Sequence, residues 1–362
     1  MENFWNKLSR PIMALAPMAD VTDAAFRRII AKYSKSESAA TPFVMWTEFV
    51  SADGLCHPVG REKLLIDLQF TEAERPIVAQ LFGANPTKME EAAALITSLG
   101  FDGLDINMGC PDRTIERQGA GAALIKNPTL AREIIRAAKR GVASAGLPDG
   151  KAGRRMPVSV KTRLGYNHDE LENWLPALLA EAPAVITLHA RIRKEMSKVP
   201  ARWERVKEAI KIRDALGSST LIFGNGDLTD VADAYRRVAE TGADGAMLGR
   251  AIFGNPWLFK ANQNVIGRDF PSLTGSRQLH SDLPDMKTRL RILLEHTKLF
   301  DQLLGQYKSF AIMKKHFKAY LSGVDGADKF RQKLMLAPDA ATVEEIINEC
   351  YTDSHVRARP LS

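Results

Sequence analysis

Residues 77–109 read IVAQLFGANPTKMEEAAALITSLGFDGLDINMG, and this stretch decides the fold of the chain. Two short apolar runs, 77–83 and 101–109, have the composition and length of buried strands. Between them, Met89, Ala93 and Ile96 recur at helical spacing within residues 87–99. The stretch therefore predicts a strand, a helix and a second strand parallel to the first.

The same alternation continues along the chain in both directions. Six further strand-like runs cover residues 11–19, 43–50, 157–165, 184–191, 220–227 and 243–250. Helical patterns separate most of them, including residues 130–143 and 228–241. Eight strand–helix units over about 250 residues predict an α/β fold of the (β/α)8 TIM-barrel type. A doubly wound sheet is the alternative, but it often has a glycine-rich loop after its first strand, and the first strand here ends in Ala16-Pro17-Met18-Ala19.

The pattern changes after Trp257. Residues 263–285 are rich in Pro, Gly, Ser and Asp, which is typical of a linker. Only helical patterns follow. Apolar stripes are formed by Met286, Leu290, Leu293 and Phe300, then by Phe310, Met313, Phe317 and Leu321, and a last helix is expected over 341–350. We therefore expect a catalytic barrel over 1–265, a linker over 266–284 and a small helical bundle over 285–362.

The charge of the chain favours an anionic partner. The 362 residues carry a net charge of +7. Residues 285–336 hold eleven Lys and Arg against five Asp and Glu, a surplus of six. Scattered lysines usually mean only a solvated helix surface. Concentration of the surplus in one small region favours a nucleic-acid contact instead.

Several protein classes are excluded by composition. Cys56, Cys110 and Cys350 are too far apart for a disulfide framework or a zinc motif, and they fit a reducing cytosol. The start, MENFWNKLSR, has no apolar core of a signal peptide, and no apolar stretch of about 18 residues could span a membrane. We expect a cytoplasmic protein without membrane contact, and the sequence indicates no stable protein partner.

The candidate site lies at the strand ends, because TIM-barrel active sites are built at the C-terminal ends of the strands. In chain order these ends supply Pro17, Met18, Thr47, Glu48, Gln80, Asn107, Cys110, Lys161, Arg163, His189, Asn225, Gly226, Asp227, Gly249 and Arg250. The set lacks the carboxylate pair of a glycosidase and a dense His/Asp cluster, so we expect no metal site.

Two glycine motifs follow the last two strands, Gly224-Asn225-Gly226 and Gly249-Arg250. Loops at these positions form the usual phosphate site of the barrel. Lys161 interrupts an apolar strand, PVSVKT, at a position expected to point into the mouth. A cation there suits flavin N1/O2, so FMN is the expected cofactor; the alternative is a strand lysine that reaches solvent.

Cys110 follows the fourth strand, between Gly109 and Pro111. Buried cysteines are usually inert core residues. A position at a strand end favours a chemical role instead. The glycines of RQGAGAALIKNP, residues 117–128, could form a mobile loop over a substrate.

Eight segments in order resemble the tRNA-dihydrouridine synthase family. They read APMADVTDAAFR, TEFVSADGL, AQLFGANP, DGLDINMGCPDRTIERQGAGAALIKNP, SVKTRLG, HARIR, GNGDLTD and GADGAMLGRAIFGNPWLF, within residues 12–259. The resemblance implies that Cys110 is catalytic and that Lys161 and His189 contact the flavin. It further assigns Pro17, Met18 and Gln80 to the isoalloxazine edge, Asn225, Gly226, Asp227, Gly249 and Arg250 to the phosphate segments, and Asn107 and Arg163 to the target uracil.

This resemblance suggests a mechanism. Reduced FMN would pass a hydride from N5 to uracil C6, and Cys110 would protonate C5. NADPH would then re-reduce the flavin. The target base must leave the tRNA stack to reach the mouth, where Asn107 and Arg163 could read its edge. For Arg163 the alternative is an ion pair with Glu48 or Asp105, since buried arginines are normally paired.

We expect the tRNA backbone to be held by basic residues from two regions. Arg191 and Arg193 belong to a loop after the sixth strand, and Lys308, Lys314, Lys315 and Lys318 belong to the tail. Two other functions stay open at this point. One is an FMN barrel of the dihydroorotate or enoate type that acts on a small molecule. The other is an RNA-binding factor with an inactive barrel.

Overall fold

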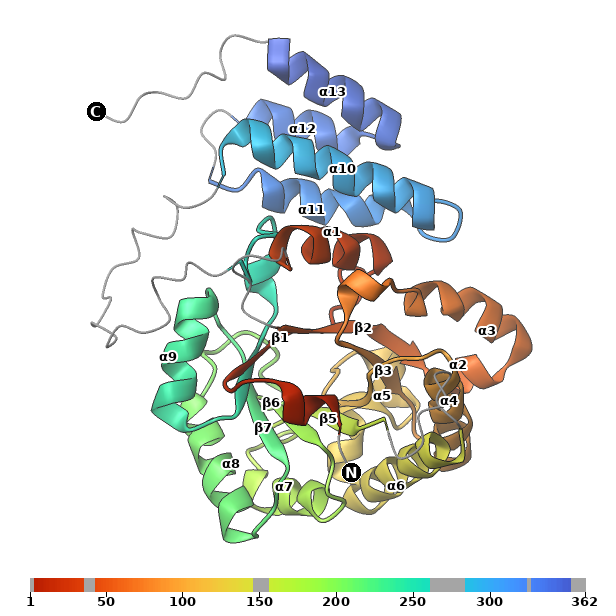
Figure 1. The fold of residues 1–362 in the computed structure, drawn as a ribbon, viewed down its shortest axis with the longest axis vertical. Coiled ribbons are helices and arrows are strands. Elements are labelled where there is room, and N and C mark those ends of the chain that lie inside the picture. Colours follow the sequence, from red (N-terminus) through yellow and green to blue (C-terminus); the bar gives the residue numbers. More distant parts are fainter. Residues whose placement is uncertain (1–2, 36–42, 146–155, 261–283, 324–326, 353–362) are drawn as a thin grey trace.

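The computed structural model describes residues 3–35, 43–145, 156–260, 284–323 and 327–352. Eight parallel strands pair in chain order and close into a barrel (Figure 1). They are β1 Ile12–Leu15, β2 Phe43–Ser51, β3 Ile77–Phe82, β4 Gly103–Met108, β5 Val158–Arg163, β6 Val185–His189, β7 Leu221–Asn225 and β8 Gly245–Leu248. The predicted TIM barrel is confirmed.

The barrel interior follows from the two-residue alternation of strand side chains. In β1, Ile12 and Ala14 belong to an interior apolar cluster, whereas Met13 and Leu15 pack in the layer under the helices. Trp5, from the short helix η1 Phe4–Lys7, reaches the same interior cluster as Trp46 and Phe223. Apolar side chains therefore fill the barrel and leave its polar groups at the C-terminal strand ends.

Helices surround the barrel as the strand–helix pattern predicts. They are α1 Ala24–Ser34, α2 Ala52–Cys56, α3 Pro58–Leu64, α4 Pro86–Ser98, α5 Arg113–Arg117, α6 Pro128–Ser144, α7 Leu171–Leu179, α8 Trp203–Ala215 and α9 Val231–Thr241. The start of α4 is marked by an Asn85 cap and Pro86, and Met89, Ala93 and Ile96 are buried against the barrel. The predicted helix over 87–99 is thus confirmed to within a residue at each end.

The segment after Cys110 differs from its expectation. We expected glycines in 117–128 to give a mobile loop. Instead α5 is followed by the short helix η4 Gly121–Lys126, whose Ala122 and Leu124 are completely buried. The apolar residues AALI anchor this segment against the barrel, so the glycines serve its tight turns rather than its mobility.

The C-terminal helices form one unit beside α1 (Figure 1). They are α10 Met286–Leu304, α11 Met313–Tyr320, α12 Asp328–Leu336 and α13 Ala340–Thr352, with η6 Phe310–Ile312 before α11. Their shared core continues onto Ala25 and Ile29 of α1, so the unit packs directly on the barrel. The predicted linker, 266–284, lies outside the described residues except for Pro284.

Candidate active site

A chain of hydrogen bonds runs along β3 and β4 toward Cys110. The Gln80 amide donates to Asp105 Oδ2 at 2.6 Å, and Asn107 Nδ2 donates to Gln80 Oε1 at 3.0 Å. Asn107 Oδ1 in turn accepts from the N–H groups of Gly109 and Cys110, at 3.1 and 2.9 Å. Asn107 therefore fixes the turn that carries the thiol.

Gln80 is completely buried below this turn. Its amide oxygen and nitrogen are both engaged within the protein. The expectation that Gln80 borders the isoalloxazine stays a prediction. Its position is a supporting one, because it links Asp105 to Asn107.

Cys110 is half-buried, and burial is the main reason that the pKa of its thiol is raised, with the charge of Asp112 adding to the shift. Its carbonyl accepts from the Ala122 N–H at 2.9 Å. A Cβ at Gly121, where φ is +60°, would lie 2.8 Å from that carbonyl oxygen. Only glycine allows this approach, so the turn of Cys110 and the start of η4 are locked together.

Lys161 stands beside Asn107 in the β4–β5 register. The side chain is half-buried, and burial together with the charge of Arg163 lowers the pKa of Lys161 to about 8. The nearby Asp105 is held by Gln80 and Ser159, and burial raises the pKa of its carboxyl to about 6. Within the described residues no ion pair joins Lys161 to a carboxylate, and its half-buried side chain keeps some contact with solvent. The flavin contact and the alternative of a strand lysine that reaches solvent therefore both stay predictions.

Arg163 is buried at the end of β5, and its partners are backbone carbonyls. Nε donates to Gly109 O at 2.7 Å, and Nη1 donates to Met196 O at 3.1 Å. Burial lowers the pKa of Arg163 to about 10. The alternative ion pair with Glu48 or Asp105 is wrong. Arg163 instead ties the residue before Cys110 to the loop after β6.

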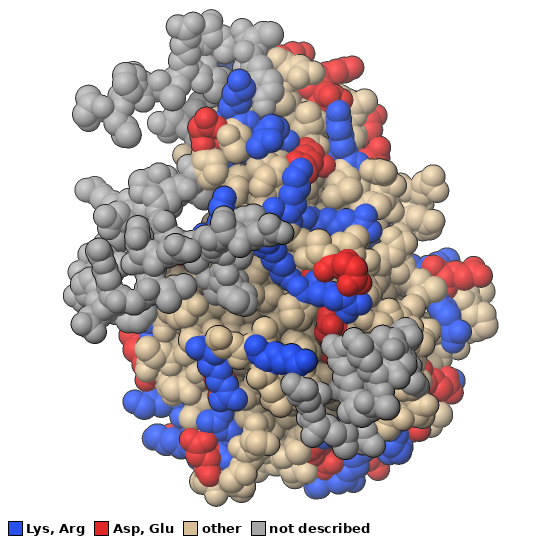
Figure 2. All heavy atoms as spheres, in the orientation of Figure 1, with Lys and Arg blue, Asp and Glu red and all other residues tan. Residues whose placement is uncertain are grey.

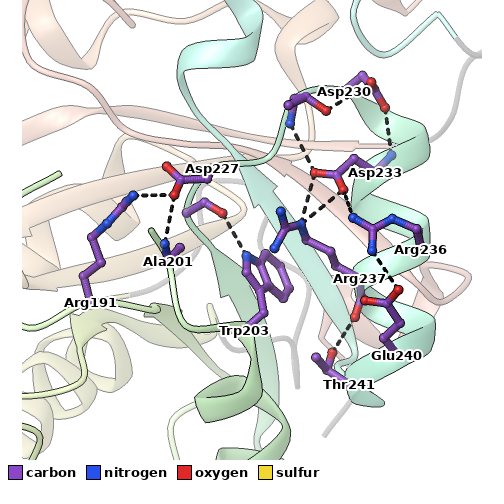
Figure 3. Close-up of polar contacts among 12 residues, drawn as sticks. Arg191, Ala201, Trp203, Asp227, Asp230, Asp233, Arg236, Arg237, Glu240 and Thr241 are labelled. Carbon is purple, nitrogen blue, oxygen red and sulfur yellow. Dashed lines mark hydrogen bonds and ion pairs between the residues drawn. The ribbon is translucent and has the colours of Figure 1, made fainter. Parts of the chain in front are cut away.

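His189, Arg191 and Asp227 form a network at the ends of β6 and β7. Arg191 contacts His189 Nε2 at 3.1 Å, and its guanidinium also pairs with Asp227 (Figure 3). Because an arginine only donates, His189 Nε2 must accept and the ring proton must be on Nδ1. Burial and the surrounding cations hold the pKa of His189 well below 6.5, so the ring is neutral.

The expectation that Arg191 lies on a surface loop is wrong. Its residue exposure is 2%, and Nε donates to Val199 O at 2.6 Å. Asp227 also accepts from the Ala201 N–H at 2.9 Å (Figure 3). Burial would raise the pKa of Asp227, but these hydrogen bonds and the two arginines lower it. Arg191 is thus a positioning residue for His189, not a surface contact for RNA.

The turns after β7 and β8 lie side by side. The Asn225 amide crosses to Met247 O at 2.7 Å, and Gly226 takes φ +123°, which favours glycine. After β8, the short helix η5 Arg250–Ile252 begins next to Gly249, and Arg250 donates to Asp227 at 2.8 Å. The predicted phosphate segments are therefore neighbours. The exposed guanidinium of Arg250 is tied to them by its ion pair with Asp227.

The turn after β1 closes the ring of strand ends. Pro17 and Met18 are half-buried, and a Cβ on Gly249 would lie 3.7 Å from Met18 Sδ. The Met18 N–H donates to Thr22 at 3.0 Å, and its carbonyl accepts from Val21 and Thr22. Pro17 and Met18 therefore border the same mouth as the phosphate segments.

The basic residues expected to hold tRNA have different surroundings. Arg193 pairs with Glu116 and lies over the Tyr166 ring, so its charge is largely compensated. Lys308 is half-buried, and its ammonium is held between Glu48 and Asp67, so the expectation that it grips a phosphate is wrong.

On α11, Lys314 is half-buried, while Lys315 and Lys318 are exposed. Figure 2 shows Lys and Arg over both the barrel and the helical unit, mixed with Asp and Glu. Of the tail lysines that we expected to hold tRNA, Lys315 and Lys318 are therefore the exposed ones, with Lys314 half-buried beside them.

The part of the chain that the structure describes has neither a metal-binding cluster nor a helix that could span a membrane. It contains no group of three or more His, Cys, Asp or Glu residues placed to hold a metal ion. None of its helices is long and apolar enough to cross a membrane.

The comparisons with known proteins agree with one another. The model of the family "Dihydrouridine synthase (Dus)" matches residues 14–355. A "Probable tRNA-dihydrouridine synthase" of Staphylococcus aureus is 36% identical over 96% of this chain and 95% of its own length. "Probable tRNA-dihydrouridine synthase 2" of Bacillus subtilis is 37% identical over 96% of both chains.

A solved amine oxidase of Pseudomonas geniculata matches 68% of this chain and 46% of its own, with 13% identity and a TM-score of 0.47. The family model and the two bacterial relatives all extend over nearly the whole chain, from the first strand of the barrel to the last helix. The chain therefore belongs to the dihydrouridine synthase family.

Proposed function

We propose that this chain is an FMN-dependent oxidoreductase that reduces uridines of tRNA to 5,6-dihydrouridine, with NADPH as the reductant. Family membership supports the reaction, because the relatives are named for it. The observation that carries it at the residue level is the grouping of Cys110, Lys161 and Arg163 at the ends of β4 and β5. A thiol acid beside two cations suits the reduction of a conjugated carbonyl compound.

The residues at the mouth fit FMN. Lys161 is a half-buried cation without a carboxylate partner among the described residues, which favours an anionic ligand. Gly226, Gly249 and the exposed Arg250 supply backbone and guanidinium groups for a phosphate, and Asn225 joins their two strands. His189, with its proton on Nδ1, offers one hydrogen-bond donor. When bound, reduced FMN supplies the hydride that uracil C6 receives.

Cys110 supplies the proton to uracil C5 in this proposal. The raised pKa of its thiol keeps the sulfur protonated at neutral pH, as a general acid requires. Asn107 holds the backbone of Cys110, and Arg163 holds the carbonyl of Gly109, so two buried side chains fix the position of the thiol. Negative charge that develops on the uracil C4 oxygen would be stabilised by the nearby cations.

We assign the same roles to the regions of the chain as the sequence suggested. Residues 1–265 form the flavin barrel, 266–284 the linker and 285–362 the tRNA-binding unit. Lys314, Lys315 and Lys318 on α11, with Arg193 beside the mouth, are the remaining candidates for phosphate contacts. Because tRNA is the substrate, the cytoplasm is the proposed location.

Purified protein tests the proposal directly. The protein should carry a flavin absorption spectrum that NADPH bleaches and that unmodified tRNA restores, with dihydrouridine detected in the tRNA by mass spectrometry. Free uridine and orotate serve as the alternative acceptors. Turnover with orotate but not tRNA would identify a small-molecule enzyme instead, and a colourless protein that cannot be loaded with FMN would point to an inactive RNA-binding barrel.

A further inference from the structure

Lys308 joins the helical unit to the barrel through two carboxylates. It lies between α10 and η6, and its Nζ is 2.6 Å from Glu48 Oε2 and 2.6 Å from Asp67 Oδ1. Its side chain is only 15% exposed. Glu48 lies in β2, and Asp67 lies in the short helix η2 Leu65–Leu68.

This arrangement depends on the lysine charge. Burial raises the pKa of Glu48, while Lys308 counteracts the shift. Burial also disfavours a charged Lys308, but the two carboxylates outweigh that effect and raise the pKa of Lys308. Removal of the ammonium would leave two poorly solvated carboxylates close together, so they would repel each other or take up a proton.

The second oxygen of Glu48 extends the contact to the mouth. Glu48 Oε1 accepts from the N–H of Asp20, a residue in the left-handed region at φ +52°. Asp20 belongs to the turn that begins at Met18 and is closed by Val21 and Thr22. A non-glycine residue in this conformation is held there by its surroundings, and Glu48 supplies that hold.

We infer that Lys308 is a positioning residue that couples the helical unit to the turn after β1 and thereby sets the flavin-side rim of the mouth. Its contact with Glu48 aligns residues 17–20 only when the helical unit is seated on the barrel. Lys308 would therefore influence turnover without touching tRNA or flavin. The inference rests on the proposed function for its catalytic consequence, but its structural part does not.

The test compares Lys308→Met with Lys314→Met, which removes a lysine of α11 that the barrel does not hold. For Lys308→Met we expect kcat with tRNA to fall about tenfold to a hundredfold through misalignment of the rim. We also expect a changed visible circular dichroism of the bound flavin and an unchanged salt dependence of tRNA binding. For Lys314→Met we expect weaker binding, a salt slope lower by about one, and an unchanged flavin signal.

Hydrogen exchange tests the structural role of Lys308 separately from its effect on turnover, because the measurement needs neither flavin nor tRNA. Residues 17–22 and 305–309 should exchange faster in Lys308→Met than in the parent protein, and Lys308→Arg should restore most of the protection. If Lys308→Met misfolds, Asp67→Asn gives the milder disturbance of the same cluster. Unchanged exchange at residues 17–22, or a salt slope that falls as for Lys314→Met, would overturn the inference. Failure of the parent protein to reduce tRNA, with the exchange result intact, would refute only the proposed function.

Discussion

Two buried histidines make the junction between barrel and helical unit sensitive to acid. His296 on α10 and His316 on α11 lie edge to face, with ring centroids 4.7 Å apart. Phe26 of α1 contacts both rings, and Phe253 stacks on His316. Both rings are completely buried, and none of their nitrogens has a hydrogen-bond partner among the described residues. Protonation of either ring would place an unpaired charge in an apolar site.

The size of the effect follows from the pKa of His296, which burial lowers from 6.5 to about 3. A histidine whose folded pKa is depressed contributes its full stability above the unfolded pKa, and loses it as pH falls toward the folded value. The loss approaches about 1.4 kcal/mol per pH unit below the unfolded pKa. Because half of the unfolded histidine is already protonated at pH 6.5, His296 alone removes about 2.3 kcal/mol between pH 6.5 and about 4.5. That is a large part of a typical folding free energy of about 5–15 kcal/mol. The pKa of His316 is also held well below 6.5 by burial, which adds to the loss.

The assay is urea unfolding of the parent protein and of His296→Leu at several pH values in this interval. The difference between the two curves isolates His296, because buried carboxyls such as Asp23, whose pKa is raised to about 7, change stability in the opposite direction in both proteins. We expect the parent protein to lose about 2.3 kcal/mol more than the variant on going from pH 6.5 to about 4.5. Parallel curves would show that His296 titrates normally, and would refute its burial as a neutral ring.

Four further predictions concern the mouth. Cys110→Ala should keep FMN but lose about a hundredfold or more in tRNA turnover, and full activity would remove the thiol from the mechanism. Lys161→Met should raise the Kd for FMN by about tenfold to a hundredfold in a flavin titration, and unchanged affinity would count against the flavin contact. Selective ¹⁵N NMR of His189 should show the proton on Nδ1 and a mixture of tautomers in Arg191→Met, whereas a proton on Nε2 in the parent protein would contradict the network. Gly226→Ala should lower the free energy of unfolding by about 1–3 kcal/mol and so lower the thermal midpoint. Gly226 has a φ of +123°, and a Cβ at this position would lie 2.8 Å from the Cβ of Ala201.

The strand–helix alternation was sufficient to predict the barrel, because period and length determine the type of each element. It also predicted that the candidate site residues lie at or just after the C-terminal ends of the strands, and the strand bounds agree, because strand polarity alone decides that. The strand–helix alternation could not predict which polar side chains face the mouth and which form hydrogen bonds or ion pairs inside the protein. In the sequence, Arg191 and Lys308 cannot be told apart from arginines and lysines on the surface. In the structure, Arg191 is buried, Lys308 is half-buried, and both are held in ion pairs.

One signal for Arg191 was present in the sequence. It follows His189 by only two residues, and a tight turn after β6, in which the Arg191 N–H donates to His189 O at 2.7 Å, brings the two side chains together. Lys308 gave no comparable signal, because its partners Glu48 and Asp67 come from segments far away in the chain. The surplus of positive charge over 285–336 also overstated the free charge of the helical unit. Glu344 of α13 lies outside that range, yet it pairs with Lys298 at 2.6 Å.

The position of the helical unit limits how a tRNA could reach the thiol. The unit contacts the barrel through α1 and through Lys308, both next to β1 and β2. In a closed barrel with strands in chain order, β4 and β5 lie across the mouth from β8 and β1. Lys315 on α11 already approaches the Asp20 carboxylate, with 3.9 Å between the charged atoms. If α11 binds the backbone, the target uridine must enter over the turn after β1 and cross the mouth to meet Cys110. Reversal of the Lys315 charge should then weaken tRNA binding more than reversal of Lys211 on α8, although the Lys211 side chain is the more exposed of the two, at 65% against 39%.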